Sequence, residues 1–93
     1  MINNDFIGIK LQSKYGFIDF NAKLRIANRY DSIGSFSENL APIYLLNKWG
    51  YIDKIERIRI QPKYDFAGKF ESQNAIVGRK GKYGIVTGRG KKF

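Results

Sequence analysis

Three observations predict an all-β fold of three tandem three-stranded antiparallel meander units, which either stack or close. Short segments alternate apolar and polar residues and are separated by turn-forming residues. The same pattern recurs at a fixed interval along the chain. No segment shows sustained helical spacing of apolar residues, so we expect helix only as a short turn between the units.

The repeat is anchored by a motif of a lysine, an aromatic residue and a glycine. Lys14-Tyr15-Gly16-Phe17-Ile18-Asp19 aligns with Lys48-Trp49-Gly50-Tyr51-Ile52-Asp53 at an offset of 48 − 14 = 34, and Lys82-Tyr83-Gly84-Ile85-Val86 continues the register without a gap. This period predicts one domain over residues 1–93, with units at about 5–27, 39–61 and 73–93. Since the chain begins and ends at unit boundaries, we expect a complete domain.

Each unit is predicted as three strands joined by two turns, giving nine strands. In the middle unit the strands are expected at 40–46, 49–53 and 57–61. Asn47 and Gly81 occupy the same hairpin position, where positive φ is easily reached, and Ser13 is the equivalent residue of the first unit.

Two linkers, at 28–38 and 62–72, are predicted between the units. Pro62 is expected to interrupt the pattern just after the third strand of the middle unit. The linkers carry aromatic residues that we expect to hold them over the sheets, namely Tyr30, Phe36, Tyr64 and Phe70. The motif glycines Gly16, Gly50 and Gly84 are expected to allow close backbone approach beside bulky neighbours.

The composition excludes much common chemistry. The sequence contains no cysteine and no histidine, which removes disulfides, thiolate metal sites and Cys/His nucleophilic pairs. No apolar run is long enough to span a bilayer, and residues 1–10 lack the features of a signal peptide. We therefore expect a cytoplasmic protein that does not enter the membrane.

Positive charge is concentrated in the second half of the chain. Lys and Arg number 17 against 8 Asp and Glu, for a net charge of +9. Residues 1–47 carry five basic and four acidic residues, whereas residues 48–93 carry twelve and four. No acidic residue follows Glu71. This polarity predicts attraction to acidic partners.

The motif at 48–53, followed by Pro62-Lys63-Tyr64-Asp65 and Phe70, resembles the WG-repeat family of bacteria and phages. The resemblance covers essentially the whole chain. Only the middle copy has the Trp-Gly pair, since the flanking copies carry Tyr-Gly and Thr87 replaces the motif aspartate. The resemblance implies a binding or interaction element without a shared catalytic residue.

Basic and aromatic residues are the candidates for partner binding. Lys23, Arg25, Arg57, Arg59 and Lys91 recur on one strand face, which suits an anionic partner but also a merely solvated face. The repeated aromatics Tyr15, Phe17, Trp49, Tyr51 and Tyr83 suit base stacking, but we expect most of them in the core. The predicted partner-binding residues are Arg57, Arg59, Arg79, Lys80, Lys82, Arg89, Lys91, Lys92 and Trp49.

The carboxylates do not indicate an active site. Asp19 and Asp53 recur at strand ends, and Asp31 and Asp65 recur beside tyrosines in the linkers, as turn-forming side chains do. No run has the spacing of a calcium loop or a phosphate-binding loop. We therefore predict no enzyme activity, no metal and no cofactor.

The leading hypothesis is a non-enzymatic protein-binding module that acts through the basic surface of its C-terminal half, as an inhibitor or adaptor of a host or phage protein. Its partner is expected to present an acidic protein surface or to be a nucleoprotein complex. The alternative is binding of RNA or single-stranded DNA, whose phosphates would meet the basic residues. Strands at 6–11 and 91–93 also predict a homo-oligomer formed through terminal strands.

Overall fold

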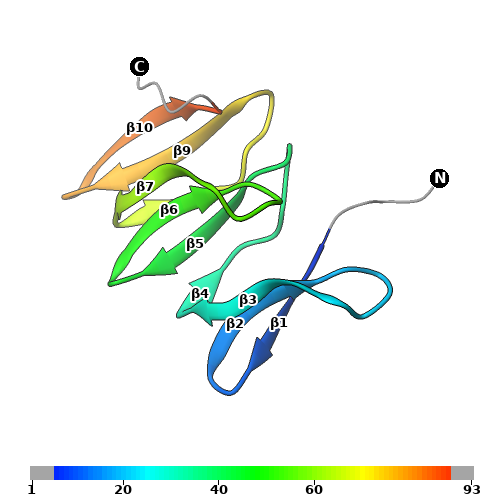
Figure 1. Cartoon of the computed structure of the whole chain (residues 1–93). Coiled ribbons are helices and arrows are strands. Elements are labelled where there is room, and N and C mark those ends of the chain that lie inside the picture. The colour runs from blue at the N-terminus through cyan, green and yellow to red at the C-terminus, as the bar shows by residue number, and fades with distance from the viewer. Residues whose placement is uncertain (1–5, 89–93) are drawn as a thin grey trace.

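The computed structural model describes residues 6–88, which form three antiparallel sheets (Figure 1). The first sheet has the order β1-β2-β3, the middle sheet β4-β5-β6-β7 and the last sheet β8-β9-β10. The strands are β1 (Ile7–Leu11), β2 (Lys14–Ile18), β3 (Leu24–Tyr30), β4 (Ser32–Ile33), β5 (Ala41–Leu45), β6 (Lys48–Ile52), β7 (Ile58–Tyr64), β8 (Phe66–Ala67), β9 (Asn74–Arg79) and β10 (Lys82–Thr87).

No helix is present between residues 6 and 88, so the short helical turn expected in the linkers does not form there. Within the same range, the structure contains no helix that could cross a membrane.

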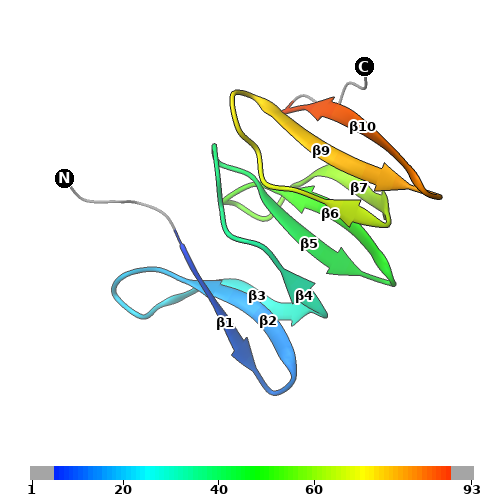
Figure 2. The ribbon, with the colours of Figure 1, turned by 180° about the vertical axis from the view of Figure 1, so that it is seen from behind.

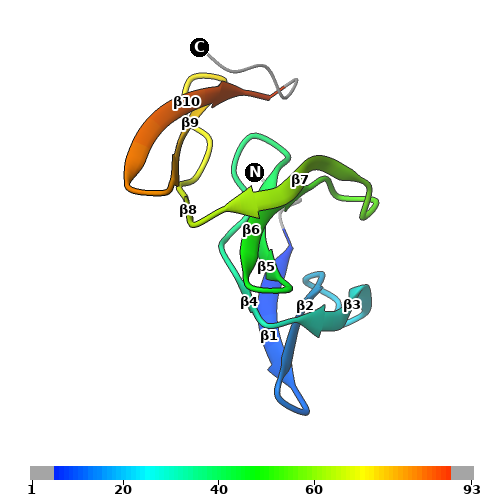
Figure 3. The same ribbon diagram turned by 90° about the vertical axis from the view of Figure 1, so that its left-hand side faces the viewer.

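The three sheets are stacked in chain order and do not close into a barrel. Figure 1 shows the first sheet at the bottom, the middle sheet above it and the last sheet on top, and Figure 2 shows the same order from behind. The side view in Figure 3 shows the first and last sheets at opposite ends of the stack. Of the two arrangements predicted, open stacking is therefore confirmed and closure is wrong.

Two hydrophobic cores hold the stack together, one at each junction between sheets. The first contains Phe17, Ile26, Tyr30, Phe36, Ala41, Ile43 and Ile52. The second contains the residues 34 positions later, namely Tyr51, Ile60, Tyr64, Phe70, Ala75, Val77 and Val86, together with Leu40. In both, aromatic residues of one sheet pack against aliphatic residues of the next, so these aromatics lie between sheets as expected.

The third strand of the middle sheet runs further than predicted. β7 continues to Tyr64 and includes Pro62, which was expected to end it. Trp49 pairs with Tyr64 and Tyr51 with Ile60, so three residues of β7 lie opposite Gly50. This bulge tolerates the missing N–H of proline because the regular ladder is already interrupted there. The linkers also form the short strands β4 and β8, which the sequence pattern did not predict.

The tight hairpins have the predicted backbone conformation. Ser13, Asn47 and Gly81 have φ values of 72°, 66° and 80°. The residue before each of them also has positive φ, as a type I′ turn requires. The loops at Ala22 and Glu56 share a φ of 63°, which again relates the first and middle sheets at the same offset.

Close backbone approach is confirmed for two of the three motif glycines. A Cβ atom on Gly16 would lie 2.4 Å from the carbonyl oxygen of Ile26, and one on Gly50 would lie 2.5 Å from that of Ile60. Gly84 has nothing within 4 Å of the corresponding point. The prediction is wrong for Gly84 because no described strand lies on that side of β10.

Candidate functional site

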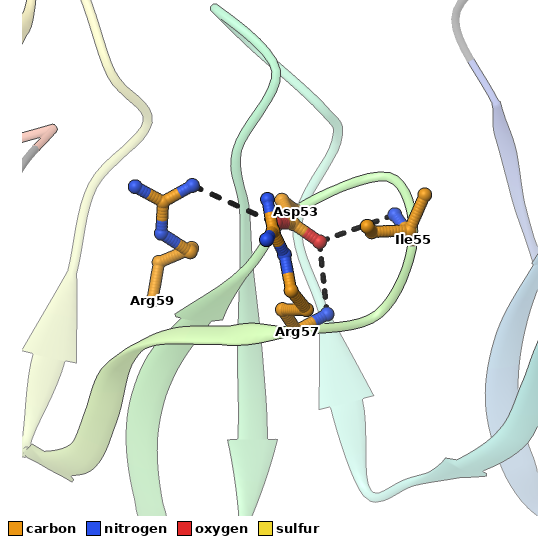
Figure 4. Close-up of polar contacts among 4 residues, drawn as sticks. All are labelled: Asp53, Ile55, Arg57 and Arg59. Carbon is orange, nitrogen blue, oxygen red and sulfur yellow. Dashed lines mark hydrogen bonds and ion pairs between the residues drawn. The ribbon is translucent and has the colours of Figure 1, made fainter.

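The β6–β7 loop is built around the carboxylate of Asp53 (Figure 4). Its Oδ1 accepts hydrogen bonds from the backbone N–H groups of Ile55 at 3.1 Å and Arg57 at 2.8 Å. Its Oδ2 accepts one from Nε of Arg57 at 2.9 Å and lies 3.6 Å from Nη1 of Arg59. The predicted turn-forming role of Asp53 is thus confirmed, and the same carboxylate positions two of the predicted basic residues.

The contacts of Asp53 keep it ionised. Its side chain is only 11% exposed, and this burial by itself raises the pKa. Hydrogen bonds from the backbone and guanidinium of Arg57 and from the backbone of Ile55 outweigh burial, so the pKa of Asp53 is below its ordinary value. Asp53 therefore carries one negative charge that offsets part of the positive charge of the two arginines.

An open groove of about 900 Å³ lies beside this loop, between the middle and last sheets. Lys54, Arg57 and Arg59 supply positive charge to its lining, whereas Leu40 and Phe70 supply buried apolar surface. The rest of the lining comes from Asp53 and Ile55 of the loop and from residues 38–39, 72–74 and 87–88. The groove therefore combines an apolar floor with a cationic wall.

The acidic residues in the groove lining are already engaged. Oε1 of Glu38 accepts a hydrogen bond of 2.7 Å from the backbone N–H of Gln73, and Asp53 holds the arginines as described. Lys54 Nζ lies 5.7 Å from the ring centroid of Phe6. Arg57 and Arg59 keep exposed side-chain fractions of 66% and 41%, so both can still meet a ligand.

The equivalent loop of the first sheet has the same closure but a different surrounding. Asp19 Oδ1 accepts hydrogen bonds from the N–H groups of Asn21 at 2.8 Å and Lys23 at 3.0 Å, and its Oδ2 pairs with Arg25 at 3.1 Å. The hydrogen bond from Lys23 is the main reason why the pKa of Asp19 is also lowered. The nearby cavity of about 580 Å³ is lined by Phe20 and other residues, none of them lysine or arginine.

A second group of predicted basic residues lies at the other end of the last sheet. Arg79 and Lys82 pair across the β9–β10 hairpin, whereas the groove touches the opposite ends of these strands, at Asn74 and Thr87. The backbone N–H of Lys80 donates a hydrogen bond of 2.8 Å to Oδ2 of Asp65. The ion pair with Lys48, followed by this hydrogen bond, lowers the pKa of Asp65.

The predicted site residues are therefore divided. Arg57 and Arg59 line the groove, and Arg79, Lys80 and Lys82 surround the hairpin tip. Arg89, Lys91 and Lys92 lie outside the described residues, as does the third strand predicted for the last unit. Lys54, Leu40 and Phe70 were not predicted as site residues. Only Lys54 carried a signal, because it replaces Phe20 of the preceding copy.

The repeated aromatics differ in burial. Phe17 and Tyr51 are fully buried, as expected for core residues. Trp49 is half-buried, packs against the second core and lies with its ring centroid 5.0 Å from that of Tyr44. Tyr83 is 72% exposed, so the core expectation is wrong for it. The reason is that no following sheet covers this face of the last sheet within residues 6–88.

No group of three or more acidic residues within 6–88 is arranged to hold a metal ion. The model of the family described as WG containing repeat matches residues 15–49 and 49–83. The chain belongs to the WG-repeat family. Neither the curated proteins nor the solved structures give a match.

The two WG repeats cross the junctions between sheets. The first match begins in β2 and ends in β6, and the second begins in β6 and ends in β10. The first WG repeat therefore contains every buried residue of the first core except Ile52, and the second contains every buried residue of the second core except Leu40 and Val86. The groove lies at the junction within the second WG repeat.

Proposed function

We propose that this WG-repeat chain is a non-catalytic protein-binding module whose groove takes an extended acidic segment of a partner protein. The cationic wall over an apolar floor is the observation that carries the proposal. Carboxylates of the partner would meet Arg57 and Arg59, and an apolar side chain would lie on Leu40 and Phe70. Such a module would act as an inhibitor or adaptor.

The two arginines are suited to this role because Asp53 positions them and still leaves their side chains available to a ligand. Arg57 forms the closer contact with Asp53, which leaves Arg59 outside hydrogen-bond distance of the carboxylate at 3.6 Å. A partner carboxylate can therefore form bidentate hydrogen bonds with Arg59 without breaking the loop. Arg89 follows directly after Gly88 of the groove lining in the sequence, so we include it with Lys91 and Lys92 in the proposed surface.

We also propose that the chain comprises three units of period 34. The correspondence of the two cores at this offset supports two junctions, and three units have two junctions between them. On this interpretation the groove belongs to the second junction, and charge differences between the two junctions determine which one binds.

The binding test is a titration of the protein into a labelled acidic peptide that contains leucine and phenylalanine, followed by fluorescence anisotropy. Arg59→Ala is expected to weaken binding by about tenfold, equivalent to about 1.4 kcal/mol. The matched control is Arg25→Ala, which removes the same side chain at the equivalent position of the first sheet, where the described lining of the nearby cavity contains no lysine or arginine. Equal loss in both variants, or no binding by the unmodified protein, would refute the proposal.

A second candidate function, binding of RNA or single-stranded DNA, is favoured by one observation. Tyr83 is 72% exposed and lies on the hairpin that also carries Arg79, Lys80 and Lys82. An exposed aromatic on a hairpin that also carries cations suits a stacked base whose phosphates reach those cations.

The salt dependence of binding and the effects of single substitutions distinguish the two candidate functions. Labelled single-stranded RNA and DNA would be titrated with nuclease-treated protein at low and moderate salt. Steep loss of affinity with salt, together with weakening by Tyr83→Ala but not by Arg59→Ala, would favour nucleic acid. No binding at low salt would exclude this candidate.

A further inference from the structure

The outward face of the last sheet is an apolar surface that no other part of residues 6–88 covers, and we call it the top face. It consists of Phe66, Ile76, Tyr83 and Ile85, whose exposed fractions range from 43% to 72%. The ring centroids of Phe66 and Tyr83 are 6.0 Å apart. A Cβ atom on Gly78 would lie 2.8 Å from the Tyr83 ring, so this ring lies across the glycine. Four adjacent large apolar side chains are unusual on a free surface.

The same face of the middle sheet is covered. Tyr51 is the residue 34 positions before Ile85, and it is fully buried by the inner face of the last sheet. Pro42, at the position of Ile76, is buried as well, and Trp49, at the position of Tyr83, packs against the same core. The top face is thus a junction surface of the kind already used twice in this chain, and no sheet formed by residues 6–88 covers it.

The other end of the stack presents the complementary surface, which we call the bottom face. Ile7, Ile9, Leu11 and Ile18 of the first sheet occupy the positions of Ala41, Ile43, Leu45 and Ile52, which cover the first sheet at the first junction. Ile7 and Leu11 are exposed, and Ile9 and Ile18 are half-buried. Arrays of stacked repeats that remain monomeric end in polar surfaces, and neither face is polar.

We infer that the top face of one molecule binds the bottom face of a second copy of this chain. The occupant follows from continuity with the internal junctions, in which residues at these same positions pack against one another. Because the two faces are different, the contact is head-to-tail. Each molecule of such a dimer keeps one free face, to which a further copy can bind. This contact is distinct from pairing of terminal strands, since it uses sheet faces rather than strand edges.

Charge gives the contact a salt dependence opposite to that of acidic-ligand binding. Each copy carries a net charge of +9, so two copies repel one another at low ionic strength. Added salt screens this repulsion and does not weaken apolar burial. Self-association is therefore expected to strengthen with salt, while binding of an acidic peptide weakens, so the failure of either proposal can be recognised separately.

The test is sedimentation velocity of the purified protein over a wide concentration range at two salt concentrations. The unmodified protein is expected to gain mass continuously with concentration. Ile85→Lys on the top face and Ile7→Lys on the bottom face should each remain monomeric. Mixing the two variants should restore a one-to-one dimer, because each retains the face that the other has lost. The dimer also shows that both variants are folded.

The matched control is Leu46→Lys, which adds the same charge at a side chain that is 83% exposed at a hairpin tip and belongs to neither face. It should associate like the unmodified protein. The inference is overturned if the unmodified protein stays monomeric at all concentrations, if both face variants still associate, if only one of them loses association, or if their mixture stays monomeric.

Discussion

The two junctions between sheets are built from corresponding residues, but they differ in the charge of the cavity beside them: within residues 6–88 the groove at the second is lined by basic residues, whereas the cavity at the first is not. Both pack an aromatic from β2 or β6 under a phenylalanine of the following linker, Phe17 with Phe36 and Tyr51 with Phe70. Both have a loop closed by an aspartate. The loop side chains differ, because Phe20, Asn21, Ala22 and Lys23 of the first loop are replaced by Lys54, Ile55, Glu56 and Arg57.

This difference distinguishes the contacts that close the loop from the side chains that the loop exposes at the surface. Arg57 forms an ion pair with Asp53, whereas in the first loop the equivalent aspartate, Asp19, forms its ion pair with Arg25. Glu56 accepts a hydrogen bond of 2.8 Å from the hydroxyl of Tyr30 and pairs with Arg29 at 3.0 Å, so the second loop also ties the middle sheet to the first. The packing is therefore common to both junctions, and the loop side chains determine the charge at each of them.

The largest expected effect tests whether the two junctions contribute equally to stability. Phe36→Ala and Phe70→Ala should each destabilise the protein by about 3–5 kcal/mol, since both remove a buried ring from a core. Urea denaturation measures the free energy of unfolding. Phe20→Ala is the control, because its ring is 59% exposed and its loss should have little effect. Unfolding by only one of the two core variants would show that the junctions are not equivalent.

The second prediction concerns the loop aspartates. Asp53→Ala should cost about 2 kcal/mol at neutral pH, because it removes hydrogen bonds to the backbone and to Arg57. The folded-state pKa of Asp53 is lowered, so its contribution is complete above the unfolded pKa of about 3.9. It is lost as the pH falls through the folded pKa.

Thermal unfolding of Asp53→Ala and the unmodified protein should therefore differ at neutral pH and converge in acid. Asp19→Ala is the comparison variant and should lose less stability, because its loop does not hold a second arginine. A greater loss of stability in Asp19→Ala than in Asp53→Ala would contradict the expectation that Asp53 stabilises its loop more strongly than Asp19 does.

A smaller effect on stability is expected from the hydroxyl group of Tyr51, which its counterpart in the first junction lacks. The hydroxyl of Tyr51 donates a hydrogen bond of 2.5 Å to the carbonyl oxygen of Gly68, and Phe17 has no hydroxyl. Tyr51→Phe should destabilise the protein by about 1 kcal/mol. Tyr83→Phe on the exposed face should leave the unfolding midpoint unchanged, and an equal loss in both would rule out the buried hydrogen bond as the cause.

The smallest effect should be a gain in stability. Leu46 has a φ of 55° at the first central position of the β5–β6 turn, a conformation that asparagine tolerates better than leucine. Leu46→Asn should stabilise the protein by about 0.5 kcal/mol. Leu46→Lys keeps an unfavourable residue type at this φ and should give no gain in thermal unfolding; equal stability of the two variants would argue against backbone strain.

Local features could be predicted from the sequence because they depend on residues close together in the chain. The hairpin turns at Ser13, Asn47 and Gly81 follow from short-range spacing, and the closures by Asp19 and Asp53 are formed within four residues. The all-β repeat architecture also follows from the sequence, since a unit with an apolar face must cover it with its neighbour, but the repeat alone left stacking and closure open.

Features that depend on distant neighbours could not be predicted. Pro62 fits within β7 only because Gly50 lies opposite a bulge. The motif aromatics were treated as equivalent, but Tyr83 is exposed because coverage comes from the following sheet rather than from its own. The basic residues were treated as one surface, whereas strand direction separates Arg57 and Arg59 from Arg79, Lys80 and Lys82.

The closure of the β6–β7 loop has a consequence for how this chain can diverge. Asp53 holds the loop through the main-chain N–H groups of Ile55 and Arg57, and every residue except proline has such a group. The first loop closes in the same way with Phe20 and Asn21 at the positions of Lys54 and Ile55. Mutational drift at positions 54 and 55 can therefore change the charge and shape of the groove wall, while selection for folding acts mainly on the aspartate.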